Sequence, residues 1–599
     1  MHDVRIAYLV SDEGVIDERT FLEGGGCPIT GARAPAEVKC PPIRFGRMFK
    51  ERDGFPPDLK NEKIRDALMG VAQCLIDLGK CMDNPECCHG EKPGKQGVSA
   101  IPAGYTYLGQ FITHEITFHK TAALSLSEAK PENARSPSLD LDSLYGEGPG
   151  VNSKSRELYV DGPHPARLKV GWTQPPPAPL TDSSQRSSRF PEFQNDLPRR
   201  ARSREREGGV AIIGDERNDE NLPLAQTHVA FLRFHNRVVD DLKGGRYKDY
   251  ARPADEGLFE KARAEVIRHF QWIVLKDYLP RIVGEDLVKS LTRKPSSDKF
   301  KKFKGEEDLF IPLEFSAAAF RIGHSMVRRI YMWSRLQGDV KLFQLFTHTK
   351  LSGNLGNFDR LNSTWVIDWK QFYDFTPFAG EYPPPYDPPQ EFNRAGKLDT
   401  TFDFRLETIP GFQHLPQPEA KNDAGEKPDD KKSANPIFNG EKALTVRNLL
   451  RGLSLGLPWA EDVAKALVDE KLLKEDECLK PAELREGQDA KLLDALGGKT
   501  PLWFYILKEA KVKEEGERLG PVGGRIVAET LIGLIRHSKY SILRRVEGTE
   551  SEWELSGWRP AYGRHSDVPE GVKFEMVDLL RAADVVDPLG KYLYQLEHP

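Results

Sequence analysis

One stretch of the sequence combines a histidine and a glutamine on an apolar background. It reads YLGQFITHE over residues 107–115 and contains Gln110 and His114. On a helix these two side chains share a face, because they are four positions apart. A carboxamide and an imidazole on such a face could handle a small polar ligand. Taken alone, a buried histidine with satisfied hydrogen bonds is the more common explanation.

A second segment, GDERNDEN at residues 214–221, places Arg217 and Glu220 three positions apart. A helix is predicted to begin close behind it, and Pro223 leaves its first residue open. Taken alone, the two charges would form an ordinary surface pair or a helix cap.

Two later segments complete the set of candidate site residues. FRIGHS at residues 320–325 contains Gly323, which would let another group approach the backbone beside His324. A glycine inside a helix is costly and therefore suggests a packing or functional reason. VRNLLRG at residues 446–452 contains Asn448.

In this order along the chain, the four segments together resemble the animal-type haem peroxidase superfamily, in its bacterial branch. That superfamily, which includes myeloperoxidase, has a histidine, an arginine with a glutamate, a second histidine and an asparagine in the same order. The stretches LDLDSLYG at 139–146 and LGPVGGR at 519–525 add to the resemblance, which spans about residues 45–542. It implies a large, mainly α haem peroxidase fold with long irregular loops and little β-structure.

The resemblance also implies a haem b cofactor and its proximal residues. His324 would be the axial ligand of the haem iron. Asn448 would accept a hydrogen bond from the other ring nitrogen, which orients the imidazole and raises its basicity. Arg321 matches an arginine placed near the haem on this side, and Gly323 would let the chain lie close to the macrocycle.

On the opposite, distal side the resemblance implies three catalytic residues. His114 would take a proton from hydrogen peroxide and return it to the leaving oxygen. Arg217 would stabilise the charge that develops as the O–O bond breaks. Gln110 would hydrogen-bond the peroxide, a water or a halide.

The sequence departs from the mammalian pattern at residues that form covalent links to haem. Thr113 stands where mammalian members carry an ester-forming aspartate, whereas Glu220 matches the second ester-forming position. One link, through Glu220, is therefore possible, and two are not. Asn221 stands where myeloperoxidase has a methionine that forms a sulfonium link, so that link is excluded.

The resemblance also extends to a calcium site. Glu115 follows the distal histidine where an aspartate is typical. Oxygen donors at alternate positions of a loop suit a hard cation such as calcium. The alternative is a helix-capping loop without metal. The matching loop residues are Ser136, Ser138, Asp140 and Asp142.

The leading interpretation is a haem peroxidase that reduces hydrogen peroxide and oxidises small electron donors such as phenols or halides. The second is a haem-dependent fatty-acid dioxygenase with a relocated radical, because Arg321 stands where that branch carries its radical tyrosine. The third is a haem-binding protein without turnover. The presence of His114, Arg217, His324 and Asn448 together counts against the third.

Most of the chain has the 3.6-residue periodicity of amphipathic helices. Alternating strand patterns are scarce, and residues 363–369 are the best candidate. We predict an N-terminal extension with a cysteine cluster at 1–95, a catalytic domain at 96–545 and a C-terminal segment at 546–599 that packs on the core. Proline-rich or charged stretches, including the basic run 199–206, are expected to be solvated loops. Helices are expected at 61–83, 224–242, 260–277, 317–330, 460–467, 501–511 and 525–536.

Composition limits the possible partners. The chain has 599 residues and a net charge of −5, so no global field attracts nucleic acid. No stretch approaches the roughly 18 apolar residues of a transmembrane helix. The start of the sequence lacks the pattern of a signal peptide, which favours a cytoplasmic protein, or one exported without such a peptide.

Cysteine usage gives little support to a disulfide framework. Six of the seven cysteines lie within the first 88 residues, and Cys478 stands alone. We expect free thiols or a local bridge there rather than a metal site, because the adjacent Cys87 and Cys88 do not match common zinc-ligand spacing. The sequence does not indicate an oligomeric state.

Overall fold

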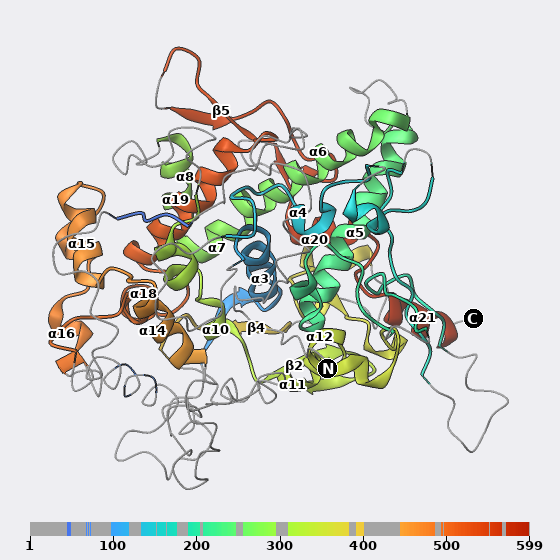
Figure 1. Ribbon diagram of the computed structural model, residues 1–599, viewed down its shortest axis with the longest axis horizontal. Helices are drawn as coiled ribbons and strands as arrows, with labels where there is room; N and C mark the ends of the chain where they lie inside the picture. Colours follow the sequence, from blue (N-terminus) through green and yellow to red (C-terminus); the bar gives the residue numbers. More distant parts are fainter. Residues whose placement is uncertain are drawn as a thin grey trace, which may run out of the picture.

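The structure is a computed structural model in which helices dominate and the few strands are short, as expected (Figure 1). It describes residues 45–49, 68, 70, 72, 97–118, 133–150, 153–162, 165–176, 190–203, 208–246, 255–294, 310–381, 391–400, 444–485, 493, 494, 496–549, 552–565 and 571–597. The N-terminal cysteines, the expected helix at 61–83 apart from three of its residues, and the charged stretch 416–436 lie outside this part.

The helices fall into two groups along the chain. The first comprises α3 (Gly104–Ile116), α4 (Asp142–Tyr145), α5 (Leu222–Lys243), α6 (Asp255–Ile273), α7 (Leu279–Val283), α8 (Glu285–Arg293), α10 (Gly323–Met326), α11 (Leu342–Thr347) and α12 (Lys350–Gly353). The second comprises α14 (Leu444–Ser454), α15 (Ala460–Asp469), α16 (Pro481–Leu484), α18 (Leu502–Glu514), α19 (Pro521–His537), α20 (Met576–Ala582) and α21 (Pro588–Glu597).

The described strands pair only in twos, and every pair is antiparallel. The pairs are β1 (Val98–Pro102) with β4 (Arg394–Gly396), β2 (Ile330–Ser334) with β3 (Gly338–Lys341), β5 (Leu543–Arg545) with β6 (Trp553–Leu555), and β7 (Arg564–His565) with β8 (Val572–Lys573).

Helix α3 lies at the centre of the fold, and Figure 1 shows it in blue between the green helices α5 and α6 and the orange helices α18 and α19. All of its residues except Thr113 are buried. A helix buried on every side is typical of a protein core rather than of a surface. Its polar residues are therefore held away from bulk water.

The predicted helix at 317–330 is wrong in its second half. The chain forms a π-helical turn, η6 (Phe315–Ala319), then the short α10, and then strand β2. Along β2 exposed and buried residues alternate at first, with Tyr331 and Trp333 buried. This alternation and the pairing with β3 outweigh helical periodicity. The π-turn widens the helix just before His324, as π-bulges often do at functional sites.

The predicted strand at 363–369 is also wrong. The segment forms two 3₁₀ turns, η8 (Ser363–Trp365) and η9 (Trp369–Gln371). The side chains of Asn362 and Asp368 each accept a hydrogen bond from a backbone N–H at the start of these turns. Such local side-chain bonds compete with strand pairing.

The basic run 199–206 is not wholly solvated. The Arg199 guanidinium is buried and forms ion pairs with Asp196 at 2.9 Å and Asp219 at 2.7 Å.

In the C-terminal part of the chain, α20 packs against α5, and the Met576 N–H donates to Asp277 on the π-turn that follows α6. No described helix is long and apolar enough to cross a membrane.

Candidate functional site

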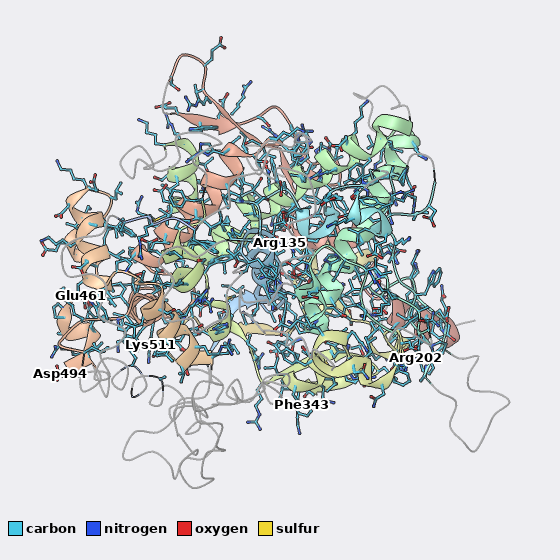
Figure 2. All side chains as sticks on the ribbon, in the orientation of Figure 1. Arg135, Arg202, Phe343, Glu461, Asp494 and Lys511 are labelled. Atoms are coloured by element: carbon cyan, nitrogen blue, oxygen red, sulfur yellow. The ribbon has the colours of Figure 1, made fainter. Side chains whose placement is uncertain are left out.

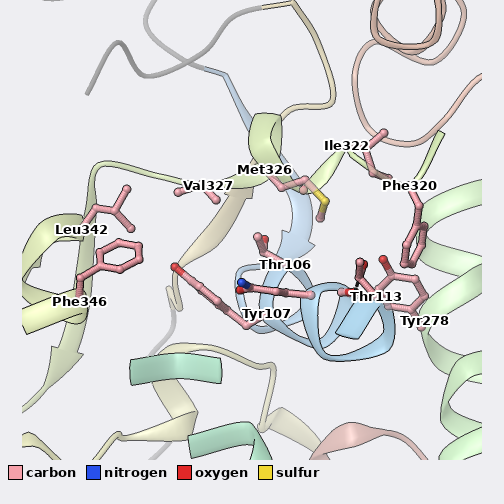
Figure 3. A pocket seen from close by; sticks show the side chains of 13 residues that line it. Thr106, Tyr107, Thr113, Tyr278, Phe320, Ile322, Met326, Val327, Leu342 and Phe346 are labelled. Atoms are coloured by element: carbon pink, nitrogen blue, oxygen red, sulfur yellow. Dashed lines mark hydrogen bonds between the residues drawn. The ribbon is translucent and has the colours of Figure 1, made fainter. Parts of the chain in front are cut away.

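A cavity separates α3 from the segment that carries His324. On the α3 side it is lined by Thr106, Tyr107, Gly109, Gln110 and Thr113. The opposite walls are largely apolar, and Figure 3 shows how the side chains of both groups face each other. They comprise Tyr278, Phe320, Ile322, Gly323, Met326, Val327, Leu342 and Phe346.

The His114 ring is fully buried one turn after Gln110 on α3. Its Nδ1 lies 2.9 Å from Asn218 Oδ1, so this nitrogen carries the proton and donates it. Its Nε2 is buried and has no hydrogen-bond partner among the described residues. Burial, together with the charge of Arg217, lowers the pKa of His114 to about 3. The ring is therefore neutral at pH 7, and Nε2 is a buried proton acceptor.

Gln110 lies in the cavity wall and contacts Glu220, where a haem link is expected, and Asn221, where a link is excluded. Its Oε1 accepts from Asn221 Nδ2 at 3.0 Å, and its Nε2 lies 3.5 Å from Glu220 Oε2. The other oxygen of Glu220 is buried without a hydrogen-bond partner among the described residues. Burial raises the pKa of Glu220 well above its usual range. The Glu220 carboxyl group therefore keeps its proton to a higher pH than an exposed glutamate does.

Arg217 contacts the backbone of His114 and is not among the residues that line the cavity. It is bonded to both oxygens of Asp215 and to the backbone carbonyls of His114 and Thr117. Among the described residues, its Nη1 alone of the three guanidinium nitrogens has no hydrogen-bond partner. Arg217 thus stabilises the C-terminal end of α3, and its Nη1 group remains available to stabilise charge.

Sequence reasoning missed Asp215 and Asn218. Asp215 is buried between two guanidiniums, because Arg135 also donates to it, and Figure 2 labels Arg135 near the centre of the molecule. Burial alone would raise the pKa of Asp215, but Arg135 and Arg217 outweigh it and hold the pKa well below its usual range. The only sequence signal for Asp215 and Asn218 was that they lie within two positions of Arg217.

On the other side of the cavity, His324 is buried on α10 and Asn448 on α14. Asn448 Nδ2 lies 2.7 Å from His324 Nδ1, and Arg321 Nη1 donates to Asn448 Oδ1 at 3.2 Å. The amide thus turns its nitrogen to the ring, whereas the sequence analysis expected its oxygen there. A histidine that binds iron through Nε2 keeps the proton on Nδ1, so metal binding would require the amide to turn over.

The expected calcium residues form a cluster beside α3. Ligand oxygens of Glu115, Asp140 and Asp142 lie within 4.8 Å of one another. The Ser136 hydroxyl bonds to both aspartates, and Ser138 takes no part in these bonds. Burial raises the pKa of Asp142 to about 6.

The same cluster also has features of a metal-free cap. The Glu115 carboxylate accepts hydrogen bonds from the backbone N–H groups of Asp142 and Ser143, which begin α4. In addition, Arg135 lies 3.6 Å from Asp142. The geometry therefore fits both alternatives of the sequence analysis.

The residues around the cavity fit a haem. A flat apolar group would find mainly hydrocarbon walls and Gly323 in the lining, and two of the walls come from the segments that carry His114 and His324, although neither imidazole itself lines the cavity. A buried imidazole nitrogen without a partner, as in His114, is costly unless a ligand meets it. A single buried histidine such as His324 is a common axial ligand of haem iron.

Comparison with known proteins agrees with this chemistry. The sequence model of the family described as animal haem peroxidase matches residues 76–369. Mouse thyroid peroxidase is 28% identical over 225 residues, which cover 34% of this chain and 20% of that protein. Heme peroxidase 2 of Caenorhabditis elegans is 25% identical over 191 residues, which cover 32% of this chain and 23% of that protein. The matches thus span less than a quarter of the length of these relatives.

Among solved structures, peroxidase A from Dictyostelium discoideum aligns over 86% of this chain and 91% of its own, with 15% identity and a TM-score of 0.46. The Oryza sativa fatty acid alpha-dioxygenase aligns over 99% of this chain and 87% of its own, with 13% identity and a TM-score of 0.49.

The Asp215 cluster generates a stability prediction. Asp215→Asn leaves two buried guanidiniums facing a neutral amide, and breaking a buried ion pair in this way costs about 3–5 kcal/mol. We expect a clearly lower melting temperature at pH 7. Because the native pKa is depressed, the contribution of the carboxylate is present above about pH 4 and is lost as the pH falls further. The matched control is Asp240→Asn, in an exposed pair with Arg167, and equal melting of both variants would contradict the cluster's importance.

Proposed function

The chain belongs to the animal haem peroxidase superfamily, and from this premise we propose that it is a peroxidase that reduces hydrogen peroxide and oxidises small donors such as phenols or halides. The observation that carries the proposal is the neutral, buried His114, whose Nε2 has no hydrogen-bond partner among the described residues and which lies on α3, the helix that forms one wall of the cavity. A general base must be unprotonated at the working pH and must face its substrate. Assignment to the bacterial branch stays a prediction.

The cofactor proposed is haem b, held by His324. Bound haem would supply the electron-transfer chemistry that side chains cannot perform. Asn448 would fix the orientation of the His324 ring by turning its oxygen toward Nδ1, which would break the present hydrogen bond from Arg321 to that oxygen. A hydrogen bond from His324 Nδ1 to the Asn448 oxygen would raise the basicity of the His324 ring as an iron ligand.

The proposed catalytic residues act on the proton of peroxide. His114 Nε2 would take it and return it to the departing oxygen, while the Nδ1–H bond to Asn218 keeps the ring in the required tautomer. The free Nη1 group of Arg217 would stabilise developing negative charge. Gln110, at the cavity wall, would hydrogen-bond the peroxide, a water or a halide.

A product assay distinguishes the three functions. Haem-loaded protein is given hydrogen peroxide with a phenol, and separately a fatty acid under oxygen. We expect oxidised phenol in the first reaction and no oxygenated fatty acid in the second. Oxygenated fatty acid would favour the dioxygenase, and no product in either reaction would favour a binding protein without turnover.

His114→Ala is expected to bind haem but to react with peroxide about 10²–10⁴-fold more slowly, because a general acid–base group is lost. Stopped-flow absorption measures this rate. In the wild type His114 stays neutral above its pKa of about 3, so it causes no loss of rate between pH 5 and 8. His537→Gln, which changes a histidine on α19 away from the cavity lining, should leave the rate unchanged. Equal rates in the His114 variant and the wild type would refute its role.

Calcium is proposed to bind Glu115, Asp140, Asp142 and the Ser136–Ser138 loop. Chelation should then lower the melting temperature, because a ligand of the native state stabilises it. Without metal, the raised pKa of Asp142 means that its stabilising protonation is lost as the pH rises through about 6.

The difference between calcium-loaded and chelated protein should therefore widen as the pH rises. Asp142→Asn should abolish this difference, and Asp161→Asn, at an exposed acid, should preserve it. A chelator without effect, together with no calcium in elemental analysis, would favour the capping loop.

Covalent attachment of haem is proposed to occur through Glu220 alone. Denaturing mass spectrometry should show a protein–haem adduct that increases after cycles of low peroxide. Glu220→Gln should lose the adduct and keep axial ligation, whereas Glu216→Gln, at an exposed neighbour, should behave like the wild type. An adduct that persists in Glu220→Gln would show another linkage.

A further inference from the structure

A group of buried aromatic side chains extends from the cavity toward the surface. Tyr107 lines the cavity and is only 3% exposed. Its ring centroid lies 6.1 Å from that of Tyr331, which is fully buried on β2. Figure 3 shows Tyr107 reaching toward the side of the cavity where Leu342 and Phe346 lie. The first two members of the group are thus both phenols.

The group continues along β2. Tyr331 and Trp333 are two positions apart on the buried face of that strand, and both pack against the ring of Phe372 at 5.6 and 5.5 Å. The indole N–H of Trp333 donates to the backbone carbonyl of Trp365 at 3.2 Å. Trp365 is half-buried and stacks on His348 with centroids 3.6 Å apart. The group therefore runs from the cavity wall to a partly exposed indole.

Packing alone does not explain the residue types. Phenylalanine would fill the space of Tyr107 without the cost of burying a hydroxyl that has no hydrogen-bond partner among the described residues, whereas the Tyr331 hydroxyl accepts a hydrogen bond from the Arg328 backbone N–H at 2.7 Å. Burial and the neighbouring Tyr331 phenol raise the pKa of Tyr107 well above its usual range, so it stays protonated at rest. Tyrosine and tryptophan are side chains that can be oxidised by one electron and reduced again. All four members of the group, Tyr107, Tyr331, Trp333 and Trp365, are of these two types.

We propose that Tyr107, Tyr331, Trp333 and Trp365 form an electron path through which donors too large for the cavity are oxidised at the surface. The inference rests on the proposed peroxidase function. A phenol at Trp365 gives up one electron and releases its phenolic proton to solvent. The electron passes through the four residues to haem that peroxide has oxidised, and each residue ends as it began. Two such donors supply the two electrons that reduce one peroxide to water.

The test compares a free phenol with the same phenol coupled to agarose beads, which cannot enter the cavity. We expect the ratio of bead-bound to free phenol oxidation to fall about tenfold or more in Trp365→Phe and in Tyr331→Phe, equivalent to at least about 1.4 kcal/mol. The control is Trp172→Phe, because Trp172 is 49% exposed and has no contact with this group among the described aromatic pairs. The absorption spectrum of haem-loaded protein verifies that each variant is folded.

A second readout does not depend on turnover. Wild-type protein treated with peroxide and no donor should give an electron paramagnetic resonance signal of a tyrosine or tryptophan radical, and peptides with oxidised Trp365. Tyr331→Phe should lose the oxidised Trp365 peptide. If the ratio of bead-bound to free phenol oxidation is unchanged in both variants while free phenol is still oxidised, the electron path is contradicted but the proposed peroxidase function is not. A wild type that oxidises neither form of phenol would overturn the path together with the proposed function.

Discussion

The site depends on two buried histidines, one on each of two segments that border the cavity, and each has its Nδ1 in contact with an asparagine. Asn218 fixes His114 at 2.9 Å and Asn448 fixes His324 at 2.7 Å. A buried imidazole without such a partner would be both costly and free to change its tautomer. The fold supplies these partners from separate elements, η3 (Glu216–Asp219) and α14, which constrains how α3, η6 and α10 can pack.

Electrostatics reinforces this constraint on the α3 side. Arg217 binds the carbonyls that end α3, and Asp215 joins it to Arg135. Arg135 in turn lies beside Asp142 of the acidic loop. The distal histidine and the proposed calcium loop therefore belong to one buried charge network.

The sequence alone predicted the family and the mainly helical fold, and among the predicted site residues Gln110 lines the cavity. It could do so because motif order survives where overall identity is low. It could not predict that 317–330 breaks into a π-turn, a short helix and a strand, because tertiary pairing overrides local periodicity. Nor could it assign Asp215 to Arg217 and Arg135, because the third partner lies 80 positions away in the chain.

The central claim, that His324 is the iron ligand, is tested most directly by titrating haem into purified wild-type protein and His324→Ala. Absorption spectroscopy should show one haem per chain with a histidine-ligated spectrum in the wild type. In His324→Ala this spectrum should be lost and should return when imidazole is added, whereas His348→Ala should match the wild type. An unchanged spectrum in His324→Ala would contradict the account.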